Sequence, residues 1–94
     1  MQFQFVVGYT EPHHVDFSFD QFGGRLVIAV DGVPVVNELR FASLRLTKRY
    51  DFAVGVVERH TVAIEKIRPL MFAGFRPNTY KIYVDGTHRQ TYRG

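Results

Sequence analysis

The chain contains one sequence pattern twice. Residues 3–17 (FQFVVGYTEPHHVDF) align with residues 50–64 (YDFAVGVVERHTVAI) at a fixed offset of 47, with six identities in fifteen positions, where average residue usage predicts about one. A second pair of segments, LVIAVDG at 26–32 and YKIYVDG at 80–86, aligns at an offset of 54 because the second copy carries seven more residues. Internal repetition of this kind predicts a fold made of two similar halves.

Length and composition fit one small domain spanning residues 1–94, with repeat one at about 1–47 and repeat two at about 48–94. Nearly half of the residues are apolar, and nine Phe and five Tyr supply most of the surface that a core needs. The chain has no cysteine, which excludes disulfides, thiolate nucleophiles and Cys-based zinc sites. The first ten residues show no signal-peptide pattern and no long apolar run, so the expected location is the cytoplasm, with no membrane partner.

Apolar and polar residues alternate through most of the chain, and this period of two predicts β-strands. The Val-Asp-Gly segments that end at Gly32 and Gly86 predict two-residue type I′ hairpins. The strand expected after Gly86 (THRQTYRG) is polar and basic, which is typical of a sheet edge. The residues expected to face the core are Phe3, Phe5, Val7, Val15, Phe17, Phe19, Leu26, Ile28 and Val30 in repeat one, and Tyr50, Phe52, Val54, Val62, Ile64, Tyr80, Ile82 and Val84 in repeat two. Val33, Val35 and Val36 continue the apolar pattern after the first turn, and Thr61, Ala63 and Glu65 are expected to face outward.

Between the repeats, Phe41, Leu44 and Leu46 alternate in RFASLRLT and predict one more strand. A short helix over 35–46 (VVNELRFASLRL) is the alternative, but its β-branched residues and the preceding hairpin favour a strand. Eight to nine short strands with one apolar face each predict an all-β fold, an antiparallel β-sandwich built from the two sequence-related repeats. A closed barrel would bury the same faces, and periodicity alone does not separate the two.

Several short motifs resemble the sandwich domain of the Fas apoptotic inhibitory molecule (FAIM) family. The similarity covers most of the chain. It implies a compact, non-enzymatic β-sandwich from a family associated with protection from cell death and with the handling of aggregation-prone proteins. It assigns no catalytic residue and no cofactor. The motifs that carry it are His14-Val15-Asp16-Phe17, Gly24-Arg25, Val30-Asp31-Gly32, Lys48, Phe52-Ala53-Val54-Gly55 and, more loosely, Val84-Asp85-Gly86.

The segment 68–77 (RPLMFAGFRP) is where the two repeats differ most. Two Arg-Pro pairs bracket an apolar run, and each proline interrupts a regular strand ladder. If exposed, the apolar side chains would form a protein-interaction surface, for a partner protein or a second copy of the chain. The alternatives are a plug that closes an open end of the sandwich and insertion into a membrane surface. The candidate interaction residues are Arg68, Leu70, Met71, Phe72, Phe75 and Arg76.

Charge is divided unevenly between the repeats. Repeat one carries three basic and five acidic side chains, whereas repeat two carries nine basic and four acidic ones. Basic and aromatic residues alternate on the last hairpin, a combination that stacks bases and neutralises phosphates. Binding of nucleic acid or another polyanion is therefore the alternative function. Its candidate residues are Lys81, Tyr83, His88, Arg89, Tyr92 and Arg93.

A Glu-x-His motif occurs at equivalent places in the two repeats, as Glu11 with His13 and Glu58 with His60. If the repeats are related by a pseudo-twofold axis, these four side chains could converge as ligands for zinc or another divalent metal. Shared ancestry of the copies explains the same repetition without a metal. No pattern identifies a catalytic pair, a nucleophile elbow or a phosphate loop, so we expect neither enzymatic activity nor a cofactor.

Overall fold

The computed structural model describes residues 1–20, 23–39, 47–68 and 78–94, and all regular structure within them is β-strand. The prediction of an all-β fold is therefore confirmed. The eight strands are β1 (Gln2–Val7), β2 (His13–Phe19), β3 (Arg25–Val30), β4 (Val33–Leu39), β5 (Thr47–Val54), β6 (His60–Ile67), β7 (Thr79–Val84) and β8 (Thr87–Arg93).

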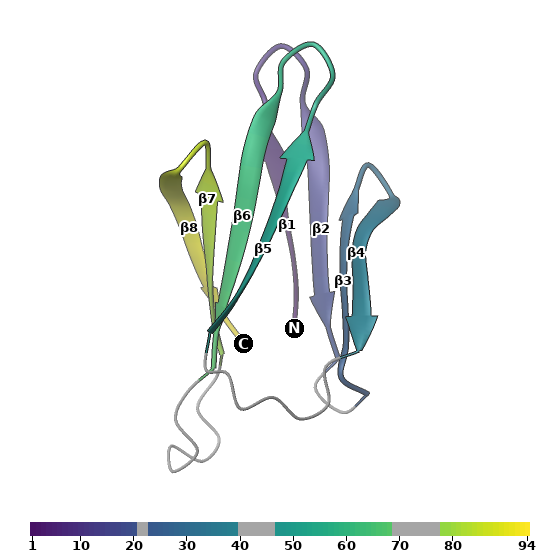
Figure 1. The fold of residues 1–94 in the computed structure, drawn as a ribbon, viewed down its shortest axis with the longest axis vertical. Helices are drawn as coiled ribbons and strands as arrows, with labels where there is room; N and C mark the ends of the chain where they lie inside the picture. Colours follow the sequence, from purple (N-terminus) through teal and green to yellow (C-terminus); the bar gives the residue numbers. More distant parts are fainter. Residues whose placement is uncertain (21–22, 40–46, 69–77) are drawn as a thin grey trace.

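The strands form two four-stranded antiparallel sheets, β1-β2-β3-β4 and β5-β6-β7-β8, each in simple sequence order (Figure 1). Each sheet corresponds to one sequence repeat, and their apolar faces pack together as a sandwich of two similar halves. The polar returning strand β8 is an edge strand, as its composition predicts. The duplication in the sequence is thus a duplication of a four-stranded meander.

The core lies between the two sheets and consists of the inward-facing residues of both repeats. Burial alternates residue by residue along β1, β2 and β7, as the period of two predicts. Phe17 and Tyr80 are fully buried, one from each sheet, with ring centroids 4.9 Å apart. Val30, Val36 and Phe52 are only partly buried but pack against this core.

Both Asp-Gly turns have the predicted geometry. The φ angles are 50° at Asp31 and 82° at Gly32, and 52° at Asp85 and 80° at Gly86, so both central residues of each turn are in the left-handed region that a type I′ hairpin requires. Each hairpin also carries an irregularity in register close to its turn, between Ile28 and Ala29 in one sheet and between Ile82 and Tyr83 in the other. The repeats therefore share turns and bulges as well as strands.

Val33 and Val35, which continue the apolar pattern of repeat one, are exposed on the edge strand β4, where Val35 is the extra residue between the pairs that Pro34 and Val36 form with β3. Ala63 faces outward as expected, between Asp51 and Tyr83 of the neighbouring strands, but it is buried because β6 has a neighbouring strand on each side. Phe41, Leu44 and Leu46 lie outside the described residues, as does most of the alternative helix, whose described part belongs to β4.

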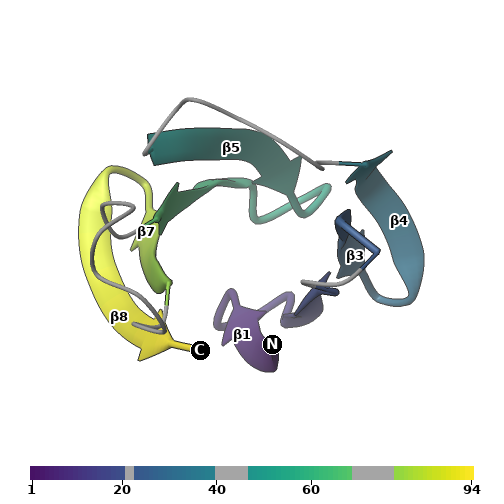
Figure 2. The same ribbon diagram turned by 90° about the horizontal axis from the view of Figure 1, so that it is seen from below.

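Seen along the strands, the sheets curve toward each other so that β1 adjoins β8 and β4 adjoins β5 (Figure 2). At the first junction the ring of Phe3 stacks on that of Tyr92 at a centroid distance of 4.2 Å. At the second, the Tyr50 hydroxyl donates a 2.8 Å hydrogen bond to Glu38. No ladder pairs β1 with β8 or β4 with β5 among the described residues, so both junctions are held by side chains.

Candidate functional site

Two loops lie side by side at one end of the sandwich, residues 8–12 between β1 and β2 and residues 55–59 between β5 and β6. Each begins with a glycine, and the φ angles are 103° at Gly8 and 98° at Gly55. A Cβ at Gly8 would lie 2.4 Å from the carbonyl oxygen of Glu11, and one at Gly55 only 2.0 Å from that of Glu58. These positions need glycine for both conformation and space, and we refer to the two segments as the clasp loops.

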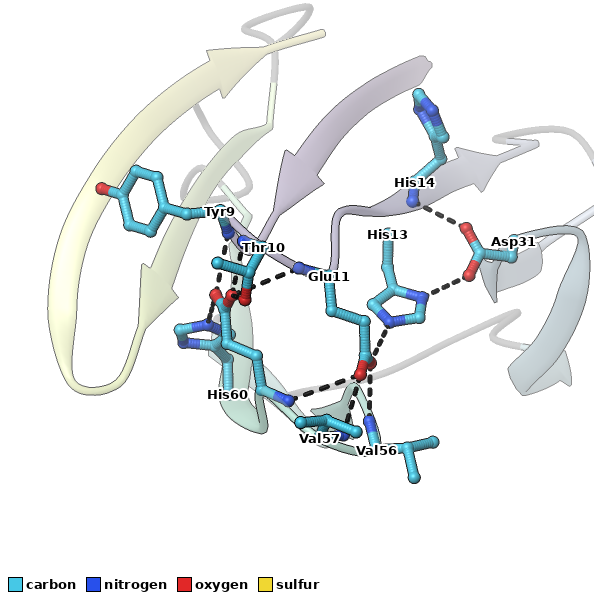
Figure 3. Close-up of polar contacts among 10 residues, drawn as sticks. Tyr9, Thr10, Glu11, His13, His14, Asp31, Val56, Val57 and His60 are labelled. Carbon is cyan, nitrogen blue, oxygen red and sulfur yellow. Dashed lines mark hydrogen bonds and ion pairs between the residues drawn. The ribbon is translucent and has the colours of Figure 1, made fainter.

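Each clasp loop is held by a glutamate of the other repeat (Figure 3). The Glu58 carboxylate accepts hydrogen bonds from the backbone amides of Tyr9 at 2.8 Å and Thr10 at 2.7 Å, and from the Thr10 hydroxyl at 2.6 Å. The amide of Glu11 donates a longer bond of 3.3 Å to it. The clasp loop of repeat one is thus held by a side chain of repeat two.

The reverse contacts follow the same pattern. The Glu11 carboxylate accepts hydrogen bonds from the amides of Val56 at 2.7 Å, Val57 at 2.8 Å and Glu58 at 3.4 Å. The two sets are related by the offset of 47, with Val56 and Val57 standing for Tyr9 and Thr10. The side-chain bond from Thr10 has no counterpart because Val57 has no hydroxyl.

A histidine and an aspartate of the same repeat complete each half. Nε2 of His13 lies 2.5 Å from the Glu11 carboxylate, and its Nδ1 contacts Asp31 of the first Asp-Gly turn. In repeat two, Nε2 of His60 lies 2.5 Å from Glu58 and Nδ1 lies 2.6 Å from Asp85. We call these six side chains the clasp: Glu11, His13, Asp31, Glu58, His60 and Asp85.

The hydrogen bonds of the clasp stabilise its charged forms. The His13 imidazole and the amides of Val56 and Val57 lower the pKa of Glu11 from 4.5 to about 2. The Thr10 hydroxyl, followed by the His60 imidazole, lowers the pKa of Glu58 even further.

The histidines shift in the opposite direction. The carboxylates of Asp31 and Glu11 raise the pKa of His13, and those of Glu58 and Asp85 raise that of His60. Each imidazole faces two carboxylates, so both of its nitrogens must donate and the imidazolium is the favoured form.

This arrangement limits what the clasp can do chemically. An imidazolium with both nitrogens bound to carboxylates has no lone pair for a metal and none for a general base. Within the described residues, no group of three His, Asp or Glu side chains is placed to hold a metal ion. The Glu-x-His motifs do come together, as the pseudo-twofold relation predicts, but each carboxylate binds backbone amides of the other repeat and its own histidine. The geometry is that of a connection between repeats.

Of the candidate interaction residues in 68–77, only Arg68 lies within the described residues, where it is partly buried just after β6. The prediction for Leu70, Met71, Phe72, Phe75 and Arg76 falls outside them.

No helix in the described part of the chain is long and apolar enough to cross a membrane.

The candidate polyanion residues occupy the β7-β8 hairpin but not one surface. Lys81 and Tyr83 alternate with the buried Tyr80 and Ile82 and therefore lie on the outer face of the sheet. His88 and Arg93 pair with outward-facing residues of β7, and the rings of Tyr83 and His88 are 5.5 Å apart. Tyr92 pairs with Tyr80 and points inward onto Phe3. Arg89 stands at the register irregularity and lines a cavity between β1 and β8.

Acidic groups are mixed with the basic ones on this outer face. Glu65 lies opposite Lys81 and Arg49 on the neighbouring strands, and Arg49 forms an ion pair with Asp51 at 3.0 Å. The Arg49 guanidinium also lies 5.6 Å from the centre of the Tyr83 ring. The outer face therefore has mixed charge.

Comparison with known proteins adds no relative. No protein-family model, no curated protein and no solved structure matches the chain.

Part of the clasp is visible in the sequence as a second repeated residue type. Glu11, His13, Glu58 and His60 are singled out by their repetition, but the carboxylates of Asp31 and Asp85 are attributed only to turn formation. Both aspartates also bind the histidines and the amides of His14 and Thr61, each at 2.9 Å. The recurrence of Glu, His and Asp in both copies indicates which residues form the clasp. That each glutamate binds the loop of the other repeat depends on how the repeats pack and cannot be seen in the sequence.

Proposed function

We propose that this chain is a non-enzymatic β-sandwich module that binds another protein through the end formed by its clasp loops. The observation that carries the proposal is a set of apolar side chains exposed there, which we call the tip patch. It comprises Tyr9, Val56 and Val57, residues that are 85%, 83% and 91% exposed. They lie on the two neighbouring clasp loops, with the Tyr9 ring directed away from the two valines (Figure 3), and exposed apolar residues at one end of a molecule favour a contact surface.

The backbone beneath the tip patch is fixed. The amides of Tyr9, Val56 and Val57 are each bound to a glutamate carboxylate of the opposite repeat at 2.7–2.8 Å. Loops that are already ordered lose less conformational entropy on binding than free loops do. Tyrosine is enriched at protein interfaces because its ring supplies contact area and its hydroxyl a hydrogen bond. The clasp thus supports a surface that is both apolar and preorganised.

This surface differs from the one that the sequence suggests. β6 begins at His60 beside the clasp loops and ends at Ile67 at the opposite end of the sandwich, so Arg68, the described member of the predicted surface, lies away from the tip patch. A non-enzymatic sandwich that binds proteins is also what the resemblance to the FAIM family implies, and we keep that relationship as part of the proposal. The partner is a protein with an apolar contact region, and a second copy of this chain is one candidate.

The test uses a photoreactive phenylalanine analogue at position 9, with the same analogue at Leu39 as the matched control. Leu39 is also an exposed apolar residue, 51% accessible, but it lies at the end of β4, away from the clasp loops. Cross-linking in cells that express the protein should join a specific protein to position 9 and not to position 39.

The cross-linked protein is then purified and titrated calorimetrically against the unmodified chain and its variants. Val57→Asp places a charge in the contact and should weaken binding at least about tenfold, whereas Leu39→Asp should leave it unchanged. Sedimentation at several concentrations shows whether the partner is a second copy. Equal affinities for Val57→Asp, Leu39→Asp and the unmodified chain would overturn the proposal.

Polyanion binding gives a different result in a simple assay. It predicts retention on heparin that falls with salt and weakens when Lys81 and Arg89 are neutralised. The mixed charges around Lys81 favour elution at low salt instead. Strong, salt-sensitive retention that depends on these two residues would favour the polyanion function over the protein-binding one.

A further inference from the structure

A cavity of about 320 Å³ lies between β1 and β8, beside the clasp. Its apolar lining includes Phe5, Ile82 and Val84, all buried core residues. Its polar lining includes Arg89 and Gln90 of β8. This volume is at the lower end of the range for small-molecule sites. Polar and apolar groups both contribute to the lining, as a ligand with a charged end and an apolar end requires.

Backbone groups of β1 also face this side. The Tyr92 hydroxyl donates to the carbonyl oxygen of Gln4, which shows that Gln4 directs its backbone toward β8. Backbone direction alternates along a strand, so Val6, which lines the cavity, directs its N–H and C=O the same way. β1 pairs only with β2 among the described strands, and the Val6 amide is therefore a donor available to a ligand.

Arg89 owes its position to a β-bulge. In the register of β7 with β8, Gln90 pairs with Ile82 and His88 with Tyr83, so Arg89 is the extra residue between them. Bulges redirect side chains and occur often beside binding sites. Arg89 forms no ion pair with any described residue. The charge of Arg89 contributes to the lowered pKa of Asp85, whose carboxylate is already bound to His60 and to the Thr61 amide.

The first repeat provides an internal comparison. In the register of β3 with β4, Val36 pairs with Ile28 and Pro34 with Ala29, so Val35 is the extra residue of the equivalent bulge. Valines 35 and 36 thus stand where the second repeat has Arg89 and Gln90. The shared bulge accounts for the similar backbone of β4 and β8. It does not account for the side chains, because only the bulge of β8 carries a cation and an amide.

We propose that the cavity between β1 and β8 binds a small carboxylate with an apolar group. The apolar group packs against Phe5 and Val84, and the carboxylate accepts hydrogen bonds from Arg89, the Gln90 amide and the Val6 backbone N–H. An arginine fork matches a carboxylate in shape and charge. The proposal is independent of protein binding at the tip patch, although Tyr9 borders both regions.

The test is an NMR titration of the full chain with phenylacetate, followed by the backbone amides. Phenylacetate should shift the amides of Val6, Val7, Gly8 and Arg89. Phenylacetamide has the same shape without the charge and should bind about tenfold more weakly, because hydrogen bonds to a charged acceptor are about twice as strong as neutral ones.

Variants locate the contact. Arg89→Val restores the residue of the first repeat and should weaken phenylacetate binding about tenfold. Arg93→Val removes the same charge from the outer face of the same strand and should have no effect. Gln90→Phe fills the cavity and should abolish binding. Arg89, Gln90 and Arg93 are all exposed, so their variants should keep the dispersed spectrum of the folded chain.

Several results would overturn the proposal: no shift at millimolar phenylacetate, equal affinity for the amide, or equal weakening by Arg93→Val. A peptide ending in phenylalanine carries the same carboxylate on a longer chain. Tighter binding of that peptide than of phenylacetate would identify the ligand as a peptide terminus and would also count against a small free acid.

Discussion

The two junctions between the sheets occupy equivalent places and are built differently. Where β1 meets β8, Phe3 stacks on Tyr92 with the ring planes 11° apart. Where β5 meets β4, the equivalent residues are Tyr50 and Glu38, and the contact is a hydrogen bond of 2.8 Å. The clasp, by contrast, uses the same residue types in both repeats. Both the clasp and the junctions join the two repeats, but only the clasp has the same chemistry in both copies.

This divergence coincides with the cavity. The junction between β1 and β8 contains the aromatic stack, and the cavity lined by Arg89 and Gln90 lies beside it. At the other junction Val36 packs against the core. A duplicated fold needs only some of its equivalent places for stability, so the rest can acquire a binding function.

Replacing Phe3 by alanine should have the largest effect on stability. The ring is buried and contacts Phe17, Tyr80 and Tyr92. We expect Phe3→Ala to lower the free energy of unfolding by about 3–5 kcal/mol, measured by urea denaturation.

The second junction provides the comparison. Tyr50→Phe removes only the hydroxyl that binds Glu38 and should cost about 1 kcal/mol. The contacts indicate that the β1–β8 junction contributes more to stability than the β4–β5 junction. Similar losses in the free energy of unfolding for Phe3→Ala and Tyr50→Phe would contradict this.

The clasp loops should be sensitive to one added methyl group. Gly55→Ala places a Cβ 2.0 Å from the Glu58 carbonyl oxygen at a φ of 98°, and we expect a loss of at least about 1–3 kcal/mol. Gly32→Ala is the matched control, because Gly32 also has positive φ but no atom within 4 Å of the added Cβ, and it should cost about 1 kcal/mol. If the two substitutions cost the same, the clasp loops are not closely packed.

Stability should depend on pH through the clasp. The pKa values of Glu11 and Glu58 are lowered from 4.5, so the stability that they contribute is complete above that pH and is lost as pH falls toward their folded values. The pKa values of His13 and His60 are raised from 6.5, so their contribution is complete below that pH and is lost as pH rises through the raised values. The clasp therefore contributes most between about pH 4.5 and 6.5.

Urea midpoints measured across the acid and alkaline ranges test this window. His13→Gln with His60→Gln keeps a polar side chain but cannot titrate, so the decline on the alkaline side should flatten. The decline on the acid side should become smaller but persist, because the backbone amides and the Thr10 hydroxyl still lower the pKa values of Glu11 and Glu58. An alkaline decline of unchanged size in the double variant would assign it to other groups.

Much of the fold is predictable from the sequence because it follows from local rules. Alternation identifies inward residues such as Phe17 and Ile82, and Asp-Gly identifies both turns with their positive φ angles. The contacts of Glu58 with Tyr9 and Thr10 are not predictable in this way, because they join residues 48–49 positions apart and depend on how the sheets pack. The same holds for Arg89, whose position depends on a bulge that shifts register by one residue.

The smallest expected effect concerns the one contact that distinguishes the two halves of the clasp. The hydroxyl of Thr10 is the main cause of the lowered pKa of Glu58, and Val57 takes its place opposite Glu11. Thr10→Val makes the halves alike, so the pKa of Glu58 should rise toward that of Glu11, which is about 2. The reciprocal Val57→Thr should lower the pKa of Glu11, because the new hydroxyl can donate to its carboxylate. NMR shifts of the carboxyl carbons during an acid titration measure both pKa values. If the pKa of Glu58 stays lower than that of Glu11 in Thr10→Val, the asymmetry arises from the histidine and aspartate partners instead.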